Sequence, residues 1–373
     1  MGRDIFEIAV NAIKLVVVFL IIVQSVPILV WLERRGSAFI QNRFGPNRVG
    51  PLGLMQLLAD AVKFLFKEEF VPAKAVTLLY YAAPIVALVP ATLAFAAIPL
   101  GHPVQWNEYV FRVQGYEMNI GIVFILAVSS LAAYAILLAG WGSGNKYALM
   151  GALRASAQVI SYELALGLSI VGVILMYGTF NLSDIIQAQQ GALSFTFLGY
   201  VVNVPFLPNW GIFYQPLGAI LFFAAAFAES NRLPFDLAEG EAELVAGFHV
   251  EYGGFKMLLF FIGEYGHMIV SSALMVTLFF GGYNVPFVTI GELQHWATTL
   301  VSSVNMASLL VGAVTFACFT IKLAGFLWIF IQVRWTLPRF RYDQLMDLGW
   351  KTMLPWALGN TVLTAIFVFL AHA

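Results

Sequence analysis

Acidic side chains crowd into one short stretch of an otherwise very apolar chain. Residues 229–251 read ESNRLPFDLAEGEAELVAGFHVE, and their carboxylates are those of Glu229, Asp236, Glu239, Glu241, Glu243 and Glu251. The chain is 61% hydrophobic and only 10% charged, so these groups must be paired, hydrated or protonated. Like charges and burial both raise the pKa of a carboxyl group. The stretch is therefore expected to hold protons and pass them on.

Three glutamates occur within or at the ends of apolar segments. Glu163 follows Ser-Tyr, Glu229 closes an apolar run, and Glu264 lies one helical turn before His267 in GEYGH. An ionisable side chain in the hydrocarbon is costly unless it is satisfied, which makes it functional by default. We predict that these glutamates transfer protons. The alternative is a structural pair, for example between Lys322 and one of them.

Other charged or polar residues in the apolar segments have simpler interpretations. Lys14 and Glu33 flank the first apolar segment, and we expect them to snorkel toward water. His267 could bind haem, but the other histidines fall in loops or at chain ends, so a second axial histidine at similar depth is missing. Haem is therefore not expected.

The composition predicts a membrane protein without a redox or nucleotide centre of its own. A charged fraction of 10% is far below the roughly 25% of soluble domains. Cys318 is the only cysteine, whereas an iron–sulfur cluster needs about four ligands. No zinc spacing, dinucleotide fingerprint or phosphate loop occurs. The net charge of −1 gives no reason to expect nucleic acid. We expect a subunit of a larger assembly or a transporter.

Apolar segments of about 20 residues predict an all-α integral membrane protein. We expect eight transmembrane helices, at about 13–32, 77–99, 119–141, 157–178, 213–229, 257–282, 305–333 and 352–371. A further apolar run at 193–202 is too short to cross and is expected to be interfacial or a loop. No internal repeat or linker divides residues 1–373, so we predict a single transmembrane helical domain.

Lysine and arginine predict the orientation of these helices. Fifteen of them fall in the loops after the first, third, fifth and seventh expected spans, and two, Arg3 and Arg112, fall on the opposite side. Positive loops face the cytoplasm. Both termini are therefore expected outside, and the segments 33–76 and 229–256 inside. The first apolar run, which leads into Glu33 rather than a cleavage site, is expected to be retained.

The first inside segment contains an amphipathic pattern at 53–69, GLMQLLADAVKFLFKEE. Leucine, alanine and valine recur at helical spacing on one face, and Gln56, Asp60, Lys63 and Lys67 fall on the other. Such a helix lies in the membrane plane. It could be a positional anchor. Alternatively, it and the arginine-rich loop 41–51 could form the mouth of a tunnel for a lipid-soluble substrate.

Several segments resemble a known family in the expected order. GLMQLLADAVKFLFKE (53–68) and PFDLAEGEAELVAG (234–247) are similar to the two signature segments of the H subunits of NADH–quinone oxidoreductase, respiratory complex I. WLERR (31–35), GPNRVGP (45–51), NKYALMGALRASAQVISYE (145–163), AESNRLPFD (228–236), HVEYGGFKMLLFFIGEY (249–265) and PRFRYDQLMDLGWK (338–351) resemble it too. The stretches between the fourth and fifth spans and at 283–304 match none of its motifs.

The resemblance implies a proton-pumping enzyme in which this subunit carries no redox centre. It implies quinone as substrate, flavin and iron–sulfur clusters in partner subunits, and contacts with hydrophilic quinone-site subunits, small and antiporter-like membrane subunits and lipid. It implies a quinone tunnel lined in part by Arg34, Arg43, Asp60, Lys63 and Phe235. It implies an acidic path through Glu163, Glu229, Asp236, Glu239, Glu241, Glu243, Glu251 and Glu264. A bacterial inner membrane is the expected location.

Other functions compete with this one. A membrane-bound hydrogenase or a ferredoxin-linked complex uses a homologous subunit. A stand-alone proton-coupled transporter would use the same acids as coupling sites, but such folds usually have internal repeats and broken helices, which this sequence lacks. A purely structural anchor for a peripheral arm would explain the basic inside loops but not Glu163 or Glu264.

Overall fold

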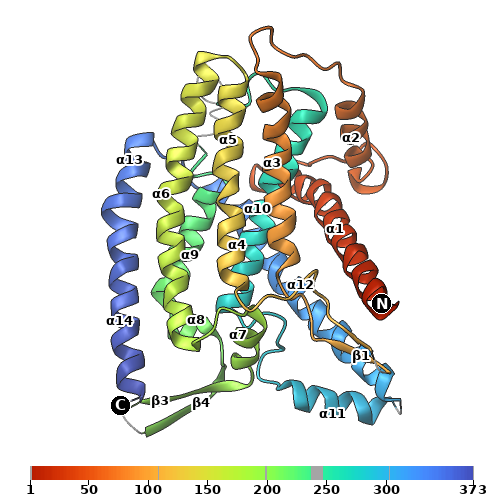
Figure 1. Ribbon diagram of the computed structural model, residues 1–373, viewed down its shortest axis with the longest axis vertical. Coiled ribbons are helices and arrows are strands. Elements are labelled where there is room, and N and C mark those ends of the chain that lie inside the picture. Colours follow the sequence, from red (N-terminus) through yellow and green to blue (C-terminus); the bar gives the residue numbers. More distant parts are fainter. Residues whose placement is uncertain (1, 108, 198–199, 237–246, 302, 373) are drawn as a thin grey trace.

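The chain folds into a mostly helical bundle (Figure 1). The computed structural model describes residues 2–107, 109–197, 200–236, 247–301 and 303–372. In the described residues, seven helical stretches are long and apolar enough to cross a membrane. They are Val10–Ile40, Thr77–Ala96, Gly121–Gly142, Lys146–Tyr177, Gly254–Phe279, Val304–Thr336 and Tyr342–Leu370. They match seven of the eight predicted spans, which confirms an α-helical multi-pass membrane protein.

Nine helices form these seven spans in the described residues. Their bounds are α1 Gly2–Ile40, α3 Thr77–Ala96, α4 Gly121–Ser129, α5 Leu131–Gly142, α6 Lys146–Tyr177, α10 Gly254–Phe279, α12 Val304–Thr336, α13 Tyr342–Asp347 and α14 Leu354–His372, with a π-helical turn Leu348–Met353 joining the last two. At α6, the Asn145 side chain accepts a hydrogen bond from the backbone N–H of Tyr147. Gly178, with φ 66°, ends that helix, because glycine adopts the left-handed conformation without strain.

The remaining predicted span is a shorter helix. Its segment forms α8 Gly211–Tyr214 and α9 Pro216–Glu229. Proline suits the first turn of α9 because it has no N–H to leave unpaired there. The 14 residues of α9 rise roughly 21 Å at 1.5 Å per residue, less than the ~30 Å of a hydrocarbon core. Its length therefore leaves the predicted count of eight spans open.

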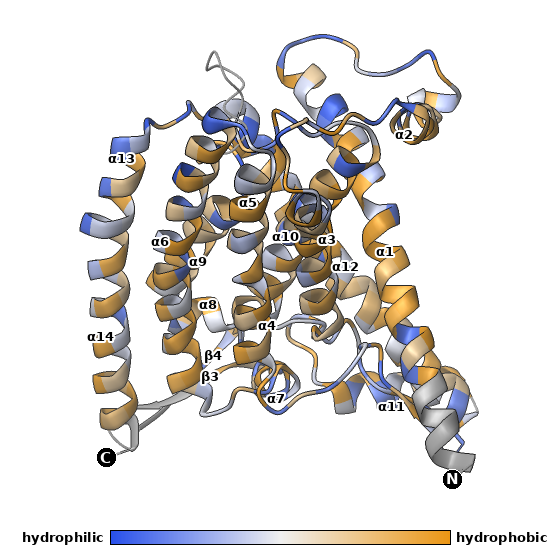
Figure 2. Cartoon of the chain, turned by 45° about the horizontal axis from the view of Figure 1, so that its top comes forward, coloured by the Kyte–Doolittle hydropathy of each residue, from blue (hydrophilic) through white to orange (hydrophobic). Residues whose placement is uncertain are grey.

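Helix α10 is the centre of the bundle. Most of its side chains from Ile262 onward are buried, and Figure 2 shows it surrounded by other helices. A Cβ atom on Gly263 would lie 2.7 Å from the backbone oxygen of Ala87 in α3. A Cβ on Gly266 would lie 2.9 Å from the Cβ of Ala91. These glycines therefore let α10 pack closely against α3.

The predicted all-α composition needs one correction, because two β-hairpins connect the helices. Strand β1 Val104–Trp106 pairs antiparallel with β2 Tyr109–Phe111, and β3 Ala192–Phe197 pairs with β4 Tyr200–Pro208. The second hairpin contains the run at 193–202 that was expected to be interfacial or a loop. Strand pairing satisfies the backbone polar groups of a connection too short to cross. Both hairpins lie at the end of the bundle that carries the chain termini (Figure 1).

Helix α2, Gln56–Phe66, lies beside the bundle rather than in it (Figure 2). It follows a 3₁₀ turn at Pro51–Gly53 and contains no buried residue. The Phe64 ring packs edge-on against Phe261 of α10, with 6.5 Å between ring centroids. Leu58, Val62 and Leu65 are exposed. The predicted helix is present, and it keeps an apolar face free of the rest of the chain.

Two short helices complete the described fold. Helix α7, Leu182–Ala188, follows α6, and helix α11, Ile290–Leu300, precedes α12. At α11, Thr289 and Glu292 form a capping box, and the backbone and side chain of Thr289 lower the pKa of Glu292 by hydrogen bonding to its carboxylate. Both helices lie at the end of the bundle with the hairpins (Figure 1). They lie in the two stretches that matched no family motif, the one between the fourth and fifth predicted spans and the one at 283–304.

The contact between α10 and α3 gives a testable prediction. Replacing Gly263 by valine overpacks this contact and should destabilise the folded chain by about 1–3 kcal/mol. The yield and thermal unfolding midpoint of the detergent-solubilised complex would measure the loss. Gly359→Ala in α14 is the matched control, since its added Cβ meets no atom within 4 Å. Equal yields and midpoints for both variants would contradict the packing argument.

Candidate functional site

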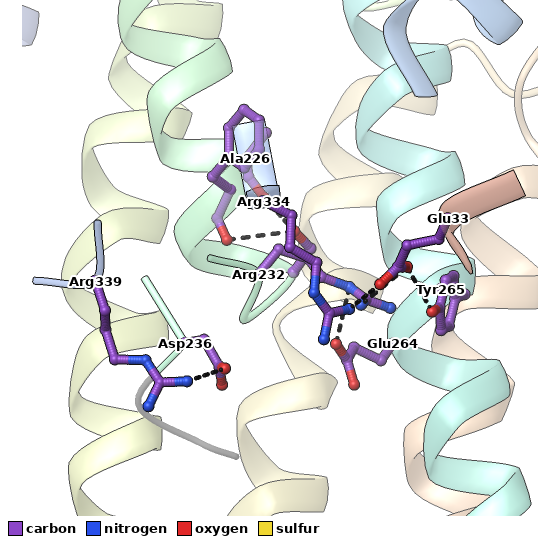
Figure 3. Close-up of polar contacts among 10 residues, drawn as sticks. Glu33, Ala226, Arg232, Asp236, Glu264, Tyr265, Arg334 and Arg339 are labelled. Atoms are coloured by element: carbon purple, nitrogen blue, oxygen red, sulfur yellow. Dashed lines mark hydrogen bonds and ion pairs between the residues drawn. The ribbon is translucent and has the colours of Figure 1, made fainter. Parts of the chain in front are cut away.

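Three helices and one loop bring a buried ionic cluster together. Glu33 comes from α1, Arg232 from the loop after α9, Glu264 and Tyr265 from α10, and Arg334 from α12 (Figure 3). The Arg334 Nη1 atom lies 2.6 Å from Glu33 Oε1, and the Arg232 Nε atom lies 2.9 Å from Glu264 Oε1. Arg232 Nη1 also lies 3.7 Å from Glu33 Oε2. Two carboxylates thus share two guanidinium groups.

The ionic cluster is held in place by one tyrosine. The Tyr265 hydroxyl donates a hydrogen bond to Glu33 Oε2 at 2.7 Å. The Arg232 guanidinium carbon stands 3.9 Å from the centre of the Tyr265 ring, within the range of a cation–π interaction. Glu33 is only 8% exposed and Arg232 only 4%. The expectation that Glu33 snorkels is therefore wrong, because its charge is compensated inside the protein and needs no water.

A second buried ion pair anchors the start of the acidic stretch. The Arg339 Nη2 atom lies 2.9 Å from Asp236 Oδ2 (Figure 3), and Asp236 is buried. Gln158 Nε2 in α6 donates to the backbone oxygens of Ala228 and Phe235 at 3.0 and 2.7 Å. These bonds fix the chain between α9 and Asp236. Glu239, Glu241 and Glu243, which the sequence also placed on the acidic path, lie outside the described residues.

Two further predicted acids lie together among serines. The Ser130 hydroxyl donates to Glu163 Oε1. Glu229, at the end of α9, is buried and lies beside the Ser129 and Ser271 side chains. Its carboxylate is also close enough to Glu163 for electrostatic repulsion. The structure therefore brings these two glutamates from α6 and α9 into one polar group, with hydroxyls from the α4–α5 junction and α10.

A partly open cavity lies beside Glu229 and the ionic cluster. Glu229, Asn231, Glu264 and His267 line it, together with His249 and apolar side chains from α3, α5 and α10. The cavity has room for a few water molecules. It therefore gives two of the predicted path residues access to the same space.

Glu251 has a different setting from the other predicted acids. Its carboxylate accepts a hydrogen bond from Asn145 Nδ2 at 2.7 Å, and its backbone oxygen accepts one from the Tyr80 hydroxyl. The Tyr252 ring stacks on that of Tyr80 at 4.3 Å, and burial raises the pKa of the Tyr252 hydroxyl. These contacts tie the loop before α10 to α3 and to the start of α6.

The predicted quinone residues divide into two places. The Arg34 Nη1 atom lies 2.6 Å from Asp60 Oδ2, which joins the end of α1 to α2. Arg43 and Lys63 are exposed in the same region. Phe235 lies apart from them, buried between Tyr162 and Phe340 with centroid distances of 5.3 and 5.6 Å. The first four residues could face a substrate at α2, whereas Phe235 packs in the core.

Two lysines bind groups that the sequence did not indicate. Lys322 Nζ donates to the backbone oxygens of Phe280, Gly282 and Asn284 at 2.7–3.0 Å. The alternative of a Lys322–glutamate pair is therefore wrong, because carbonyl oxygens at the end of α10 surround the ammonium. Lys256 lies 3.2 Å from Glu69 and joins the end of α2 to α10.

Sequence reasoning missed the arginines that neutralise the acids. Arg232, Arg334 and Arg339 were counted only as part of the positive inside loops. Their signal was present, because each lies within a few residues of the end of a predicted span. A buried carboxylate at a helix end requires a cation nearby, but the sequence does not show which helix ends meet.

Comparisons with known proteins identify the family. The chain matches the NADH dehydrogenase family over residues 13–365. It is 68% identical to the H subunit of the NADH-quinone oxidoreductase of Bdellovibrio bacteriovorus, with 100% of this chain and 99% of that protein covered. The chain belongs to the NADH dehydrogenase family. The resemblance to H subunits that the sequence motifs indicated is confirmed.

More distant relatives agree with this membership. The chain is 43% identical to an H subunit of the NADH-quinone oxidoreductase of Cytophaga hutchinsonii, over 91% of each chain. It is 44% identical to the NADH-quinone oxidoreductase subunit 8 of Rhodothermus marinus, over 95% of this chain and 96% of that protein. The predicted function as a membrane subunit of an NADH–quinone oxidoreductase is thereby confirmed. In the described residues no group of three or more histidine, cysteine or acidic side chains could hold a metal ion.

The ionic cluster predicts the effect of removing its central cation. Arg232→Met should destabilise the folded chain by about 3–5 kcal/mol, because it leaves buried carboxylates without compensation. Thermal unfolding of the purified complex and the amount of assembled complex in membranes measure this. The control is Arg341→Met, since Arg341 pairs with Asp343 in an exposed position and such pairs contribute little. An Arg232 variant as stable as the control would show that the cluster does not hold the fold.

Proposed function

We propose that this chain forms part of the quinone access tunnel and of the acidic path that couples quinone reduction to proton translocation. One observation carries the proposal. Glu33 and Arg34 are consecutive at the end of α1, yet Glu33 enters the buried ionic cluster while Arg34 binds Asp60 of α2. A change of charge beside Asp60 of α2 therefore acts on the same turn of α1 that contributes Glu33 to the ionic cluster.

The tunnel mouth would lie where α2 meets α1. The exposed apolar face of α2 suits an isoprenoid tail, and the exposed Arg34–Asp60 pair and Lys63 supply polar groups beside it. A lipid-soluble quinone reaches such a site from the membrane, which fits a helix lying in the membrane plane. The Lys256–Glu69 pair ties the segment after α2 to α10, and the Arg34–Asp60 pair ties the middle of α2 to α1. These contacts favour a tunnel mouth over a loose anchor.

The path begins with the charge change of the reaction. Reducing a quinone to a quinol takes up two electrons and two protons. Withdrawing protons near the inner face alters the balance in a cluster where two carboxylates share two guanidinium groups. Protonation of Glu33 or Glu264 would weaken its hold on Arg232. Glu264 lines the cavity that Glu229 also lines, so the disturbance can reach Glu229 and its neighbour Glu163.

The topology follows from this function. We propose that α9 completes eight membrane-crossing segments together with its flanking residues, that both termini lie outside, and that α2 lies in the inner membrane plane. The whole chain then forms one membrane domain, with the acidic loop 229–256 at the inner face. The bacterial relatives favour the bacterial inner membrane. Partner subunits would carry the flavin and the iron–sulfur clusters, and others would continue the proton path.

The competing functions are separated by copurification. A stand-alone transporter would purify without flavin or iron–sulfur proteins. A hydrogenase-type complex would bring a nickel–iron subunit instead of a nicotinamide-oxidising one. The family match and the names of the relatives favour the NADH-linked complex.

Glu229 tests the acidic path. Glu229→Gln keeps the shape and hydrogen bonding of the buried side chain but cannot exchange a proton. Quinone reduction and proton pumping by the assembled complex should fall roughly 100-fold or more, the lower end of the range for a proton-transferring side chain. NADH oxidation by an artificial acceptor that reacts at the peripheral arm should stay unchanged. Unaltered quinone reduction and pumping in an intact complex would refute the path.

Asp60 tests the tunnel mouth. Asp60→Ala removes the partner of Arg34 and should raise the apparent KM for quinone several-fold, with a smaller effect on kcat, because it disturbs substrate entry rather than chemistry. Steady-state kinetics with a short-chain quinone measure this. The control is Lys74→Gln, an exposed residue of the same segment. If the Asp60 variant only lowers the amount of assembled complex, α2 is an anchor.

A further inference from the structure

His267 occupies a position between the two groups of acids. It lies in α10 one turn after Glu264 and one turn before Ser271, so the three side chains share a face of the helix. Glu264 belongs to the ionic cluster, and Ser271 lies beside Glu229. The histidine therefore stands on the direct line along α10 from one group to the other.

The His267 ring borders the partly open cavity. Its Nε2 atom is buried and has no hydrogen-bond partner among the described residues. The Oδ1 atom of Asn231, which lines the same cavity, is likewise buried and unpartnered within the described part of the chain. An unsatisfied buried polar atom costs about 1–3 kcal/mol, and water in a polar cavity removes that cost. These two atoms favour a hydrated cavity.

The two groups of acids have different surroundings. Arg232 pairs with Glu264, whereas Glu229 lies beside the Ser129 and Ser271 side chains. The cavity is the space that both carboxylates border. The titratable side chains that face it are Glu229 from α9, Glu264 and His267 from α10, and His249 from the loop before α10. A group able to both accept and donate a proton is needed there.

We propose that His267 is a proton-relay residue that connects Glu264 with Glu229 through the cavity. The imidazole accepts one proton on one ring nitrogen and releases one from the other, so one proton moves and no electron does. The step needs only the two carboxyl groups and intervening water. This inference rests on the proposed acidic path and assigns to it a residue that the acidic motifs did not include.

Substitution in the intact complex tests the relay. His267→Gln keeps a polar side chain of similar length but cannot carry a proton, and it should lower coupled quinone reduction and pumping roughly 100-fold or more. His267→Ala should do the same, and added imidazole should restore a measurable part of the rate by entering the enlarged cavity. Inner-membrane vesicles with a pH-sensitive dye report pumping, and NADH oxidation by an artificial acceptor reports the peripheral arm.

His102 provides the matched control. It is a partly buried histidine next to Gln294 at the opposite end of the bundle, where burial lowers its pKa, and it borders none of the described acids of the path. His102→Gln should leave quinone reduction and pumping at the rates of the unaltered complex. Imidazole should have no effect on it.

The outcomes separate the relay from the path. A His267→Gln complex with normal quinone reduction and pumping overturns the relay, and so does an assembled alanine variant that imidazole does not rescue. If the alanine variant does not assemble, the glutamine variant decides alone. If Glu229→Gln is impaired while His267→Gln is normal, the path stands without this histidine. If neither is impaired, the path itself fails.

Discussion

The cost of burying charge is the constraint on which this structure depends. Glu33 and Arg232 are almost fully buried, and an isolated charge in that position would be far too costly to keep. The cluster solves this by matching the carboxylates of Glu33 and Glu264 with the guanidinium groups of Arg232 and Arg334. Because each charge comes from a different part of the chain, α1, α10, α12 and the loop after α9 must meet at one point.

The same cluster makes the fold responsive to its surroundings. A balanced set of charges at low dielectric changes greatly in energy when one proton is added or removed. Glu33 precedes Arg34 in the chain, and Arg34 binds Asp60 of α2. The ionic cluster is therefore next to the surface where a lipid-soluble substrate would arrive. Glu264 lines the cavity that Glu229 also lines, so the ionic cluster is also next to the buried acid of α9. In the proposed function, stability and proton transfer therefore use the same side chains, which would explain why acids persist in so apolar a chain.

Helix α10 organises the interior for this purpose. Its glycines allow close packing against α3, which leaves little room for rearrangement. Its polar face carries Glu264, His267 and Ser271 through the centre of the bundle. The carbonyl oxygens beyond its end bind Lys322 of α12, so the helix is fixed there by a charge as well. A rigid helix with one polar stripe keeps the distances along a proton path constant.

The sequence alone determined the apolar spans, the amphipathic pattern of α2, the family and the acids themselves, because hydrophobic periodicity and the cost of isolated charges are local properties of a chain. It did not determine the partners of those acids. Glu33 was expected in water and Lys322 beside a glutamate, yet the charges of both are stabilised by groups distant in sequence. It also did not predict the hairpins or the shortness of α9, nor that Phe235 would pack in the core between Tyr162 and Phe340. Only tertiary packing decides which helix ends meet, and therefore which charges compensate one another.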